Sequence, residues 1–377
     1  MLIGIDASRA TLAHRTGTET YSLRLIEALL RLDSGHRFRL YTNGTPPAGL
    51  FWDDVAPSGG EVRSIPFPRL WTHLRLSAEM LRYPPDVLFV PAHVLPLIHP
   101  RRSVATVHDV GYLFYPEAHH PADRRYLDWS TGWNARRSAA VLADSAATKA
   151  DLVRAYGVDP GGVHVVYLGR DAALAPVRDA DALARVRARY GIGERYLLYV
   201  GTLQPRKNLA RLVDAFAPLA GDPALDGVQL VLAGKRGWLD DDLAPRVARL
   251  GLSERVRFPG YVADADLPAL LSGARAFVFP SLYEGFGIPV LEAQSCGVPV
   301  MTSNNSSLPE VAGDAALLVD PHDVDAIAEA MCRLVTDDAL RAELVRRGFE
   351  NVKRFSWEKC ARETLEVLEG VSRQVDR

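Results

Sequence analysis

The sequence repeats one local pattern along its whole length: a short apolar run rich in β-branched residues, then a turn, then a segment with helical periodicity. Buried runs that alternate with helices are typical of parallel sheets covered on both faces, so the pattern predicts an α/β fold. The strands expected in the first half are Leu2–Asp6, Phe38–Thr42, Asp86–Val90, Val104–His108, Ala140–Ala143 and Val163–Val166, with helices such as Thr18–Leu32, Ala122–Arg137 and Thr148–Tyr156. Those expected in the second half are Tyr196–Val200, Val228–Ala233, Val256–Phe258, Ala276–Phe279, Val298–Thr302 and Ala316–Val319.

The pattern stops once and starts again, which predicts two domains. A chain of 377 residues is long enough for two or three domains, and the stretch 169–193, rich in Ala, Arg and Asp, reads as a linker. We therefore expect one doubly wound domain over 1–168 and a second over 169–355, with their ligand sites facing a shared central cleft. Residues 356–377 hold a last helix, for which Ser356 is the expected N-cap.

Composition excludes several classes of protein. The formal net charge of -2 argues against nucleic acid as a partner, since nucleic-acid-binding domains are usually basic. The three cysteines are far apart and lack CxxC spacing, which argues against a disulfide framework or a structural zinc. The N-terminal segment lacks the features of a secretory signal, and the longest apolar stretch, 87–98, is too short to cross a bilayer. We expect a cytoplasmic protein, with peripheral contact at the inner face of the membrane as a further hypothesis.

The segment 279–300, FPSLYEGFGIPVLEAQSCGVPV, carries the sharpest chemical signal. A buried strand ends at Pro280, and a glycine-rich turn then leads into a helix that opens near Ile288 and Pro289, proline being well suited to a first helical turn. Backbone amides at a helix N-terminus favour an anion, while the carboxylates of Glu284 and Glu292 would accept hydrogen bonds from sugar hydroxyls. Acidic residues placed only by the helix dipole remain the other interpretation.

The segment 196–216, YLLYVGTLQPRKNLARLVDAF, has two adjacent cations between a strand and a helix. Arg206 and Lys207 suit a diphosphate, the first as a planar fork and the second as a point charge, with Asn208 as the expected helix cap. Lys207 is one of only five lysines beside 39 arginines, which suggests a specific need for the ammonium. A solvated charge pair in a loop is the alternative.

Two further features lie in the first half. His108 and Asp109 follow an expected strand and could make polar contact with a substrate, although a histidine held by backbone groups in a turn is the other interpretation. Gly17 and Thr18 precede an amphipathic helix in a phosphate-type turn. That turn lacks the GxGxxG spacing of a dinucleotide fold, and the chain has no GxxxxGK[ST], so a dehydrogenase or a P-loop enzyme is poorly supported.

Taken in order along the chain, these motifs resemble the family-four retaining glycosyltransferases of GT-B architecture. The resemblance covers essentially the whole chain. Its motifs are the Gly17 loop, the His108–Asp109 edge, VLADSAATKADL, VGTLQPRKNL, VLAGKRGW, FPGYV, the glutamates 284 and 292, TSNNSSLPEVAGDAALLVDP and the ending NVKRFSWEKCARETLEVLE. It implies two Rossmann-like domains around a central cleft and a last helix that crosses back onto the N-terminal domain.

The resemblance also implies roles for individual residues. Glu292 would hold the ribose of a sugar nucleotide and Glu284 the hydroxyls of the transferred sugar. The catalytic set that it implies is His108, Asp109, Arg206, Lys207 and Glu284. The set that it implies around the sugar nucleotide is Gly17, Thr18, Gly201, Thr202, Arg206, Lys207, Tyr261, Val262, Glu284, Gly285, Phe286, Gly287, Ile288 and Glu292. The sequence departs from the commonest family pattern at Thr202, where many members carry a phosphate-binding arginine, and Arg206 would take over that role.

The implied reaction is the transfer of a hexose from a GDP- or UDP-linked donor to a glycan, a lipid-linked or a small-molecule acceptor, as in bacterial polysaccharide biosynthesis. Mannose from GDP-mannose is our first choice. Fixed cations and a helix N-terminus can stabilise a departing diphosphate, so we expect no metal and no resident cofactor. Three pairs of aspartates have the DxD spelling of metal-dependent transferases, and we interpret them as helix caps or solvated acids: 179 with 181, 264 with 266, and 323 with 325. The competing hypotheses are a nucleotide-sugar epimerase or hydrolase, and a non-catalytic glycan-binding protein.

Arginines interleave with large apolar residues in two segments of the first half. The segment 67–83 mixes Arg69, Arg75 and Arg82 with tryptophan and leucine, and arginines 124, 125, 136 and 137 flank Trp129 and Trp133. Such faces suit anionic bilayers or lipid-diphosphate acceptors. Ordinary helices that cover a sheet and turn their arginines to water are the alternative.

Overall fold

The computed structural model describes residues 1–12, 17–47, 49–51, 55, 59–92, 94–235, 237 and 242–373. The chain folds into two compact units. Unit 1 consists of Met1–Gly169 together with Phe355–Arg377, and unit 2 consists of Arg170–Arg354. These limits lie next to the domain boundaries expected from the sequence, and the C-terminal helix belongs to unit 1.

Unit 1 is built on a seven-stranded sheet with the order β3-β2-β1-β4-β5-β6-β7, in which every pair of neighbours is parallel. Strands β4 and β5 are buried along their whole length, as a sheet covered on both faces requires. The strands are β1 (Leu2–Asp6), β2 (Arg37–Thr42), β3 (Glu61–Ser64), β4 (Val87–Val90), β5 (Ser103–Val107), β6 (Ala140–Ala143) and β7 (Val163–Val165).

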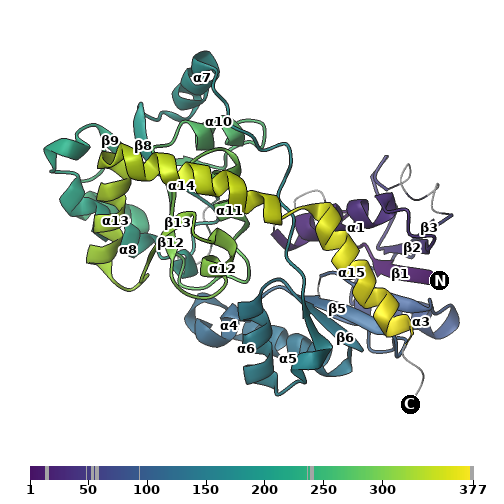
Figure 1. The fold of residues 1–377 in the computed structure, drawn as a ribbon. Helices are drawn as coiled ribbons and strands as arrows, with labels where there is room; N and C mark the ends of the chain where they lie inside the picture. Colours follow the sequence, from purple (N-terminus) through teal and green to yellow (C-terminus); the bar gives the residue numbers. More distant parts are fainter. Residues whose placement is uncertain are drawn as a thin grey trace. The chain divides into compact units, whose positions relative to one another are not determined.

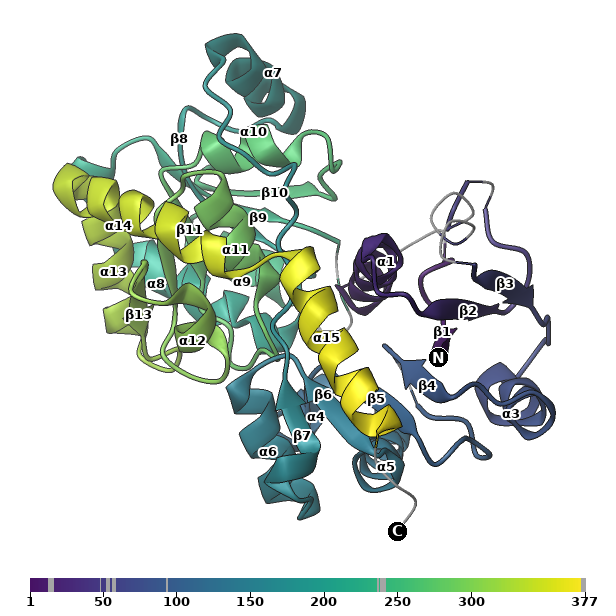
Figure 2. The ribbon, with the colours of Figure 1, turned by 45° about the vertical axis from the view of Figure 1, so that its right-hand side comes forward.

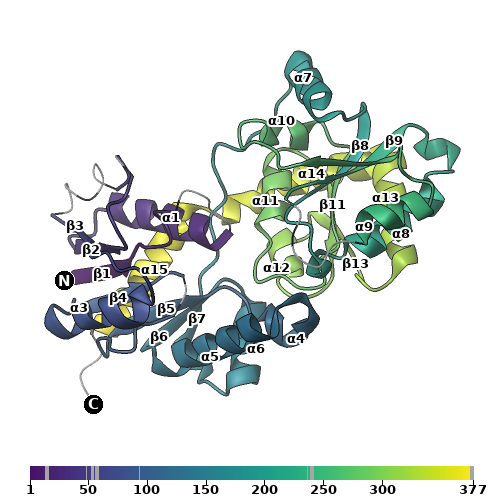
Figure 3. The same cartoon turned by 180° about the vertical axis from the view of Figure 1, so that it is seen from behind.

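Helices cover both faces of this sheet. Helices α1 and α15 pack against each other on one face, and Figure 2 shows α15 in front of β5 and β6 with α5 behind them. Figure 3 shows unit 1 from behind, with α5 and α6 toward the viewer. Ser356 caps α15 as predicted, because its hydroxyl accepts a hydrogen bond from the backbone amide of Lys359. The helices of unit 1 are α1 (Gly17–Arg31), the π-helical turn η1 (Thr72–Leu76), α3 (Ser77–Arg82), α4 (Gly111–Phe114), η2 (Pro116–Ala118), α5 (Pro121–Arg137), α6 (Ala146–Tyr156), η3 (Pro160–Gly162) and α15 (Trp357–Ser372).

Unit 2 contains a six-stranded parallel sheet with the order β10-β9-β8-β11-β12-β13. Figure 1 shows its strands enclosed by helices, among which α8 packs with α13 and α11 packs with α14. The strands are β8 (Arg195–Val200), β9 (Val228–Ala233), β10 (Val256–Gly260), β11 (Ala276–Phe279), β12 (Val300–Ser303) and β13 (Ala316–Val319). The helices are α7 (Ala180–Tyr190), η4 (Pro205–Lys207), α8 (Leu209–Leu219), η5 (Pro223–Leu225), α9 (Leu243–Arg249), α10 (Leu267–Ser272), α11 (Ile288–Ser295), α12 (Leu308–Ala312), α13 (Val324–Thr336), α14 (Asp338–Asn351) and η6 (Val352–Arg354).

The predicted α/β class is therefore confirmed, with two doubly wound parallel sheets. The short polar strand β3 is the only strand of the described structure that the sequence pattern missed. Strand order reverses between β1 and β4 in unit 1 and between β8 and β11 in unit 2. Such reversal points open a crevice at the carboxyl ends of the strands, where doubly wound proteins bind their ligands. None of the helices among the described residues is long and apolar enough to cross a membrane.

Candidate functional site

The candidate site of unit 2 lies at the reversal point of its sheet. Arg206 and Lys207 belong to η4, in the connection that leaves β8, and Glu284 lies in the turn that follows β11. The backbone amide of Leu282 donates to the carbonyl of Arg206 over 2.9 Å, which joins the two connections directly. The sheet thus brings together three side chains that are far apart in sequence.

These side chains form one buried ion cluster. The Lys207 Nζ lies 2.6 Å from Glu284 Oε1, and the Arg206 Nη1 lies 3.3 Å from Glu284 Oε2. All three side chains are at most 14% exposed, and the Lys207 ammonium also lies 5.2 Å from the centre of the Phe279 ring. Burial alone would raise the pKa of Glu284, but Lys207 and Arg206 outweigh it and hold that pKa below its usual value. Two cations facing one carboxylate leave an excess of positive charge, which favours an incoming anion.

Two serines after β12 fix the turn that carries Glu284. Ser306 Oγ accepts a hydrogen bond from the Glu284 amide over 3.1 Å. Ser307 Oγ lies within hydrogen-bond distance of the carbonyl oxygens of Glu284 and Phe286, at 2.9 and 2.7 Å. The sequence analysis gave these serines no role, although their place after the strand next to β11 could have indicated one.

The prediction that the Asn208 side chain caps α8 is wrong. Asn208 precedes α8 in the left-handed region, with φ of 64°, and its side chain makes no capping hydrogen bond. Instead its amide nitrogen donates to the carbonyl oxygens of Pro280 and Pro321, at 3.0 and 2.6 Å. The Asn208 side chain therefore joins the connection that carries the two cations to the end of β11, and it is used for these hydrogen bonds instead of capping α8.

Helix α11 begins at Ile288, where the sequence predicted it, with Pro289 in its first turn. Gly287 adopts a φ of +106°, and a side chain there would meet Leu308 Cδ2 at 2.8 Å, so only glycine fits this entry to the helix. Glu292 lies in the second turn. Burial, with the negative charges of Asp171 and Asp264, raises the pKa of Glu292 to about 7.

Four further residues predicted in unit 2, namely Gly201, Thr202, Tyr261 and Val262, lie at the ends of β8 and β10. Gly201 and Thr202 leave β8, and Gly234 leaves β9 so close to it that a side chain on Gly234 would meet the Gly201 carbonyl oxygen at 1.9 Å. Tyr261 follows β10 and is 58% exposed, while Val262 is buried. The Lys235 ammonium lies 5.1 Å from the centre of the Tyr261 ring, a contact that sequence reasoning did not identify.

In unit 1, His108 is fixed between two neighbouring strands at the carboxyl edge of the sheet. Its Nδ1 lies 2.7 Å from Asp144 Oδ2 beyond β6, and its Nε2 lies 3.0 Å from the Pro91 carbonyl oxygen beyond β4. Burial alone would lower the pKa of His108, but Asp144 and the carbonyl raise it above its usual value. Both ring nitrogens face acceptors, which favours the imidazolium and leaves no lone pair to act as a base.

The acid next to His108 in the sequence, Asp109, takes part in a turn. Asp109 accepts a hydrogen bond from the backbone amide of Gly111 over 2.8 Å and so closes a turn, while Asp144 is the acid that contacts His108. Asp144 lies in the VLADS segment at the end of β6, directly beside β5. Because the carboxyl ends of parallel neighbours meet at one edge, this position could have indicated the pair.

Gly17 and Thr18 begin α1, and the Thr18 carbonyl accepts a hydrogen bond from Ser22. The loop at 13–16 that precedes them lies outside the described residues. The residues of the predicted catalytic and sugar-nucleotide sets are thus divided between the two units, with Gly17, Thr18, His108 and Asp109 in unit 1 and the others in unit 2.

Two of the three DxD pairs contain a helix cap, as we predicted. Asp179 and Asp323 cap α7 and α13 through their side chains. Asp266 begins α10 without capping it, and instead pairs with Arg189 Nη1 at 2.7 Å and accepts a hydrogen bond from Tyr190. In the part of the chain that the structure describes, no three metal-ligating side chains come together.

Comparison with known proteins matches both units to families of glycosyltransferases. Residues 15–174 match the family described as Glycosyltransferase Family 4, and residues 182–351 match Glycosyl transferases group 1. The O-antigen chain mannosyltransferase B of Escherichia coli is 34% identical over an alignment covering 93% of this chain and 95% of that protein. The serotype-specific mannosyltransferase WbdA of Escherichia coli is 35% identical over 192 residues, which cover 50% of this chain and 23% of that protein.

Solved structures share the fold. A sucrose-phosphate synthase from Thermosynechococcus elongatus matches with a TM-score of 0.74 at 23% identity, covering 98% of both chains. The Anabaena protein Alr3699/HepE, in complex with UDP and glucose, matches with a TM-score of 0.72 at 20% identity, covering 98% of this chain and 99% of that one.

Proposed function

Because this chain belongs to the family-4, group 1 glycosyltransferases and has their GT-B fold, we propose that it transfers mannose from GDP-mannose to a glycan acceptor. The transfer would retain the configuration of the sugar and would need no metal ion. One observation carries this proposal: Arg206, Lys207 and Glu284 meet in a buried cluster with an excess of positive charge.

The cluster supports a diphosphate leaving group. When the bond between the sugar carbon C1 and the phosphate oxygen breaks, the electron pair and its negative charge go to the diphosphate. Arg206 and Lys207 are held in place before the reaction by Glu284, so they can stabilise that charge without reorganising. Glu284 in turn stays ionised and offers its oxygen atoms to the hydroxyls of the sugar.

Glu292 supports a ribose site. No hydrogen bond joins its side chain to another described residue, so its oxygens can accept from the two ribose hydroxyls. The acceptor oxygen would attack the face of C1 from which the diphosphate departs, and its proton would pass to the departing phosphate. His108 would act as a fixed positive charge, since neither of its ring nitrogens has a lone pair to take that proton.

Two observations favour mannose and a glycan acceptor. Both of the Escherichia coli relatives described above are mannosyltransferases, one of them of the O-antigen chain. The match to the O-antigen enzyme runs over nearly the whole of both chains, so it includes the unit that we expect to bind the acceptor as well as the one that we expect to bind the donor.

A thermal-shift screen against GDP-, UDP-, ADP- and TDP-sugars tests the donor, because a ligand that binds only the folded chain raises its melting temperature. We expect GDP-mannose to give the largest shift, and a Lys207→Ala variant to lose most of it. Incubation of GDP-mannose with a mannan oligosaccharide should then yield a lengthened product. Epimerised GDP-sugar would instead identify an epimerase, and binding without turnover would identify a glycan-binding protein. The absence of a shift with any sugar nucleotide would contradict the proposal.

A further inference from the structure

Helix α5 buries small residues and leaves two of its aromatic residues exposed. Its buried residues are Ser130, Thr131, Gly132, Asn134 and Ala135, and Trp133 is partly buried against the core of the unit. The aromatic side chains Tyr126 and Trp129 are 43% and 44% exposed. A helix that only covered a sheet would do the opposite and bury its aromatic rings, because they have the most apolar surface to remove from water. The arrangement of α5 indicates a partner on its outer side.

A neighbouring segment extends this apolar surface. Leu70 and Leu74, just before and within η1, are 64% and 51% exposed. Leu70 also has a φ of +54°, a conformation that costs energy for a residue with a side chain. His73 joins the segment to α5, because its ring lies 5.6 Å from that of Trp129 and its Nε2 lies 3.3 Å from the Tyr126 hydroxyl. We call the exposed side chains of Leu70, Leu74, Tyr126 and Trp129 the apolar patch.

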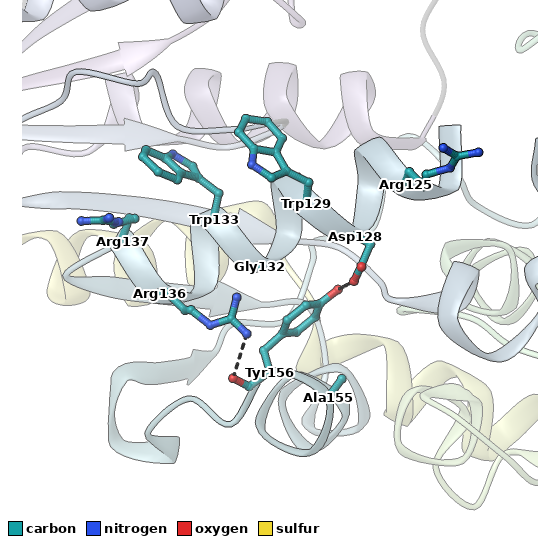
Figure 4. A pocket seen from close by; sticks show the side chains of 9 residues that line it. All are labelled: Arg125, Asp128, Trp129, Gly132, Trp133, Arg136, Arg137, Ala155 and Tyr156. Carbon is teal, nitrogen blue, oxygen red and sulfur yellow. Dashed lines mark hydrogen bonds between the residues drawn. The ribbon is translucent and has the colours of Figure 1, made fainter. Parts of the chain in front are cut away.

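Arginines border the apolar patch on a groove of about 640 Å³ between α5 and α6. Figure 4 shows Trp129 and Trp133 on one side of α5 and Arg136 with Tyr156 on the other. Gly132 forms the floor, where a side chain would meet Arg136 Nη1 at 3.0 Å and Tyr156 at 3.3 Å. Trp129 lines the groove and also contacts His73, so the groove and the apolar patch are continuous.

The charge of the groove is strongly unbalanced. Three arginines line it, Arg125, Arg136 and Arg137, against the single acid Asp128. Asp128 already accepts a hydrogen bond from the Tyr156 hydroxyl over 2.8 Å. The guanidinium carbon of Arg137 lies 5.1 Å from the centre of the Trp133 ring and that of Arg136 lies 5.6 Å from the centre of the Tyr156 ring, which holds both cations at the surface.

We propose that unit 1 docks on an anionic phospholipid bilayer through the apolar patch and the arginine groove. Leucine, tryptophan and tyrosine side chains favour the boundary between head groups and acyl chains, and arginines beside them attract the negative surface. A saccharide could stack on the tryptophans, but it would give no reason for two leucines held in water beside them. This proposal goes beyond the transfer reaction and does not depend on which donor the enzyme uses.

Co-sedimentation with vesicles tests the docking. The full chain is mixed with vesicles of phosphatidylcholine alone and of phosphatidylcholine with phosphatidylglycerol. We expect binding to the anionic vesicles only, and weaker binding at high salt. Each arginine near such a surface contributes roughly a fivefold change in partitioning. The double variant Leu74→Ser with Arg125→Glu should therefore bind at least about tenfold more weakly.

The matched control is Leu250→Ser with Arg185→Glu, which removes an exposed leucine and an exposed arginine from unit 2. It should bind the anionic vesicles as the unaltered chain does. Equal binding by the two double variants would overturn the proposal, and so would an absence of binding to anionic vesicles. Retention of the unaltered chain by soluble mannan, without vesicle binding, would identify the groove as a saccharide site and would also overturn it.

Tryptophan fluorescence locates the contact. Anionic vesicles should shift the emission of the unaltered chain to shorter wavelength, and Trp129→Phe should remove most of that shift while still sedimenting with the vesicles. A shift of full size in Trp129→Phe would place the contact elsewhere. The GDP-mannose thermal shift, measured without vesicles, should be the same in all of these variants, so that failure of the docking proposal and failure of the proposed function are distinguishable.

Discussion

In unit 2 two cations, Arg206 and Lys207, share the carboxylate of Glu284, whereas in unit 1 a single imidazole lies between the Asp144 carboxylate and the Pro91 carbonyl. Both arrangements lie at the carboxyl edge of a parallel sheet. The first has positive charge left over after its internal pairing. In the second, both N–H groups of the His108 ring are directed at acceptors within unit 1. Under the proposed function, equivalent edges of two similar sheets would therefore have different tasks, anion binding in unit 2 and a fixed local charge in unit 1.

Lys207→Ala should have the largest effect on transfer. It removes the shorter of the two contacts to Glu284 and one of two positive charges at the proposed diphosphate. We expect the transfer rate to fall by about 100- to 1000-fold, as for loss of one fixed group that stabilises developing charge. Lys353→Ala is the control, because that lysine is exposed and pairs with the exposed Glu350. Equal rates in both variants would remove the distinction between the two sheet edges.

Glu292→Gln should weaken donor binding by about 10- to 100-fold, since charged hydrogen bonds to two ribose hydroxyls become neutral ones. The same variant should stabilise the unliganded chain. The pKa of Glu292 rises from 4.5 to about 7 on folding, so the folded state holds an extra proton between these values and loses stability as the pH rises through them. Glu292→Gln should therefore raise the free energy of unfolding by on the order of 1–3 kcal/mol at pH 8 and leave it unchanged at pH 4.

Chemical denaturation at the two pH values, with GDP titrations beside it, measures both effects of this variant. Glu329→Gln on the exposed side of α13 provides the control. A Glu292→Gln variant that is less stable than the unaltered chain at pH 8 would contradict the assignment of a destabilising buried carboxyl.

Asp144→Asn should have a smaller effect on transfer, about tenfold, because Asp144 positions His108 and is not expected to touch the substrate. Its effect on stability should depend on pH. The folded pKa of His108 lies above its unfolded value near 6.5, so the stabilisation from the charged pair is fully present below pH 6.5 and is lost as the pH rises through the folded pKa. Burial raises the pKa of Asp144 above its usual value despite His108, so the comparison avoids acid pH, and we expect the difference in melting temperature to be larger near pH 6.5 than near pH 9. A difference that is the same at every pH would show that the pair is not ionic.

Removal of divalent metal should have the smallest effect, namely none. The proposed stabilisation of the diphosphate comes from Arg206 and Lys207, which are part of the chain. We expect the transfer rate to be unchanged after dialysis against EDTA, with and without added magnesium. A rate that falls with EDTA and recovers with magnesium would mean that unit 2 does not supply enough positive charge on its own.

The sequence was informative where neighbouring residues decide the structure and less so where distant ones meet. The entry to α11 follows from the local pattern of glycine and proline, and its position was predicted. The strand Glu61–Ser64 was missed because an edge strand of four mainly polar residues lacks the apolar run on which the prediction relied.

Two contacts at the candidate sites were not predicted, for the same reason. Asn208 looked like a cap, but its partners are carbonyls 72 and 113 positions away. The sequence analysis named no hydrogen-bond partner for His108, and the structure shows one 36 positions away on the adjacent strand. Local spacing cannot register such contacts, whereas the rule that parallel neighbours end at one edge would have found Asp144.

The placement of α15 has a consequence for biosynthesis. Unit 1 is discontinuous: its last helix is separated from the rest of the unit by the 185 residues of unit 2, and this helix packs on α1, β4 and β6. Gly169 lies so close to it that a side chain there would meet the Trp357 backbone nitrogen at 2.4 Å. During translation the residues of unit 1 that are made first must wait for α15, which is made after the whole of unit 2. Unit 2 can therefore be complete before unit 1, and nascent unit 1 must keep an apolar face unpaired until α15 has left the ribosome.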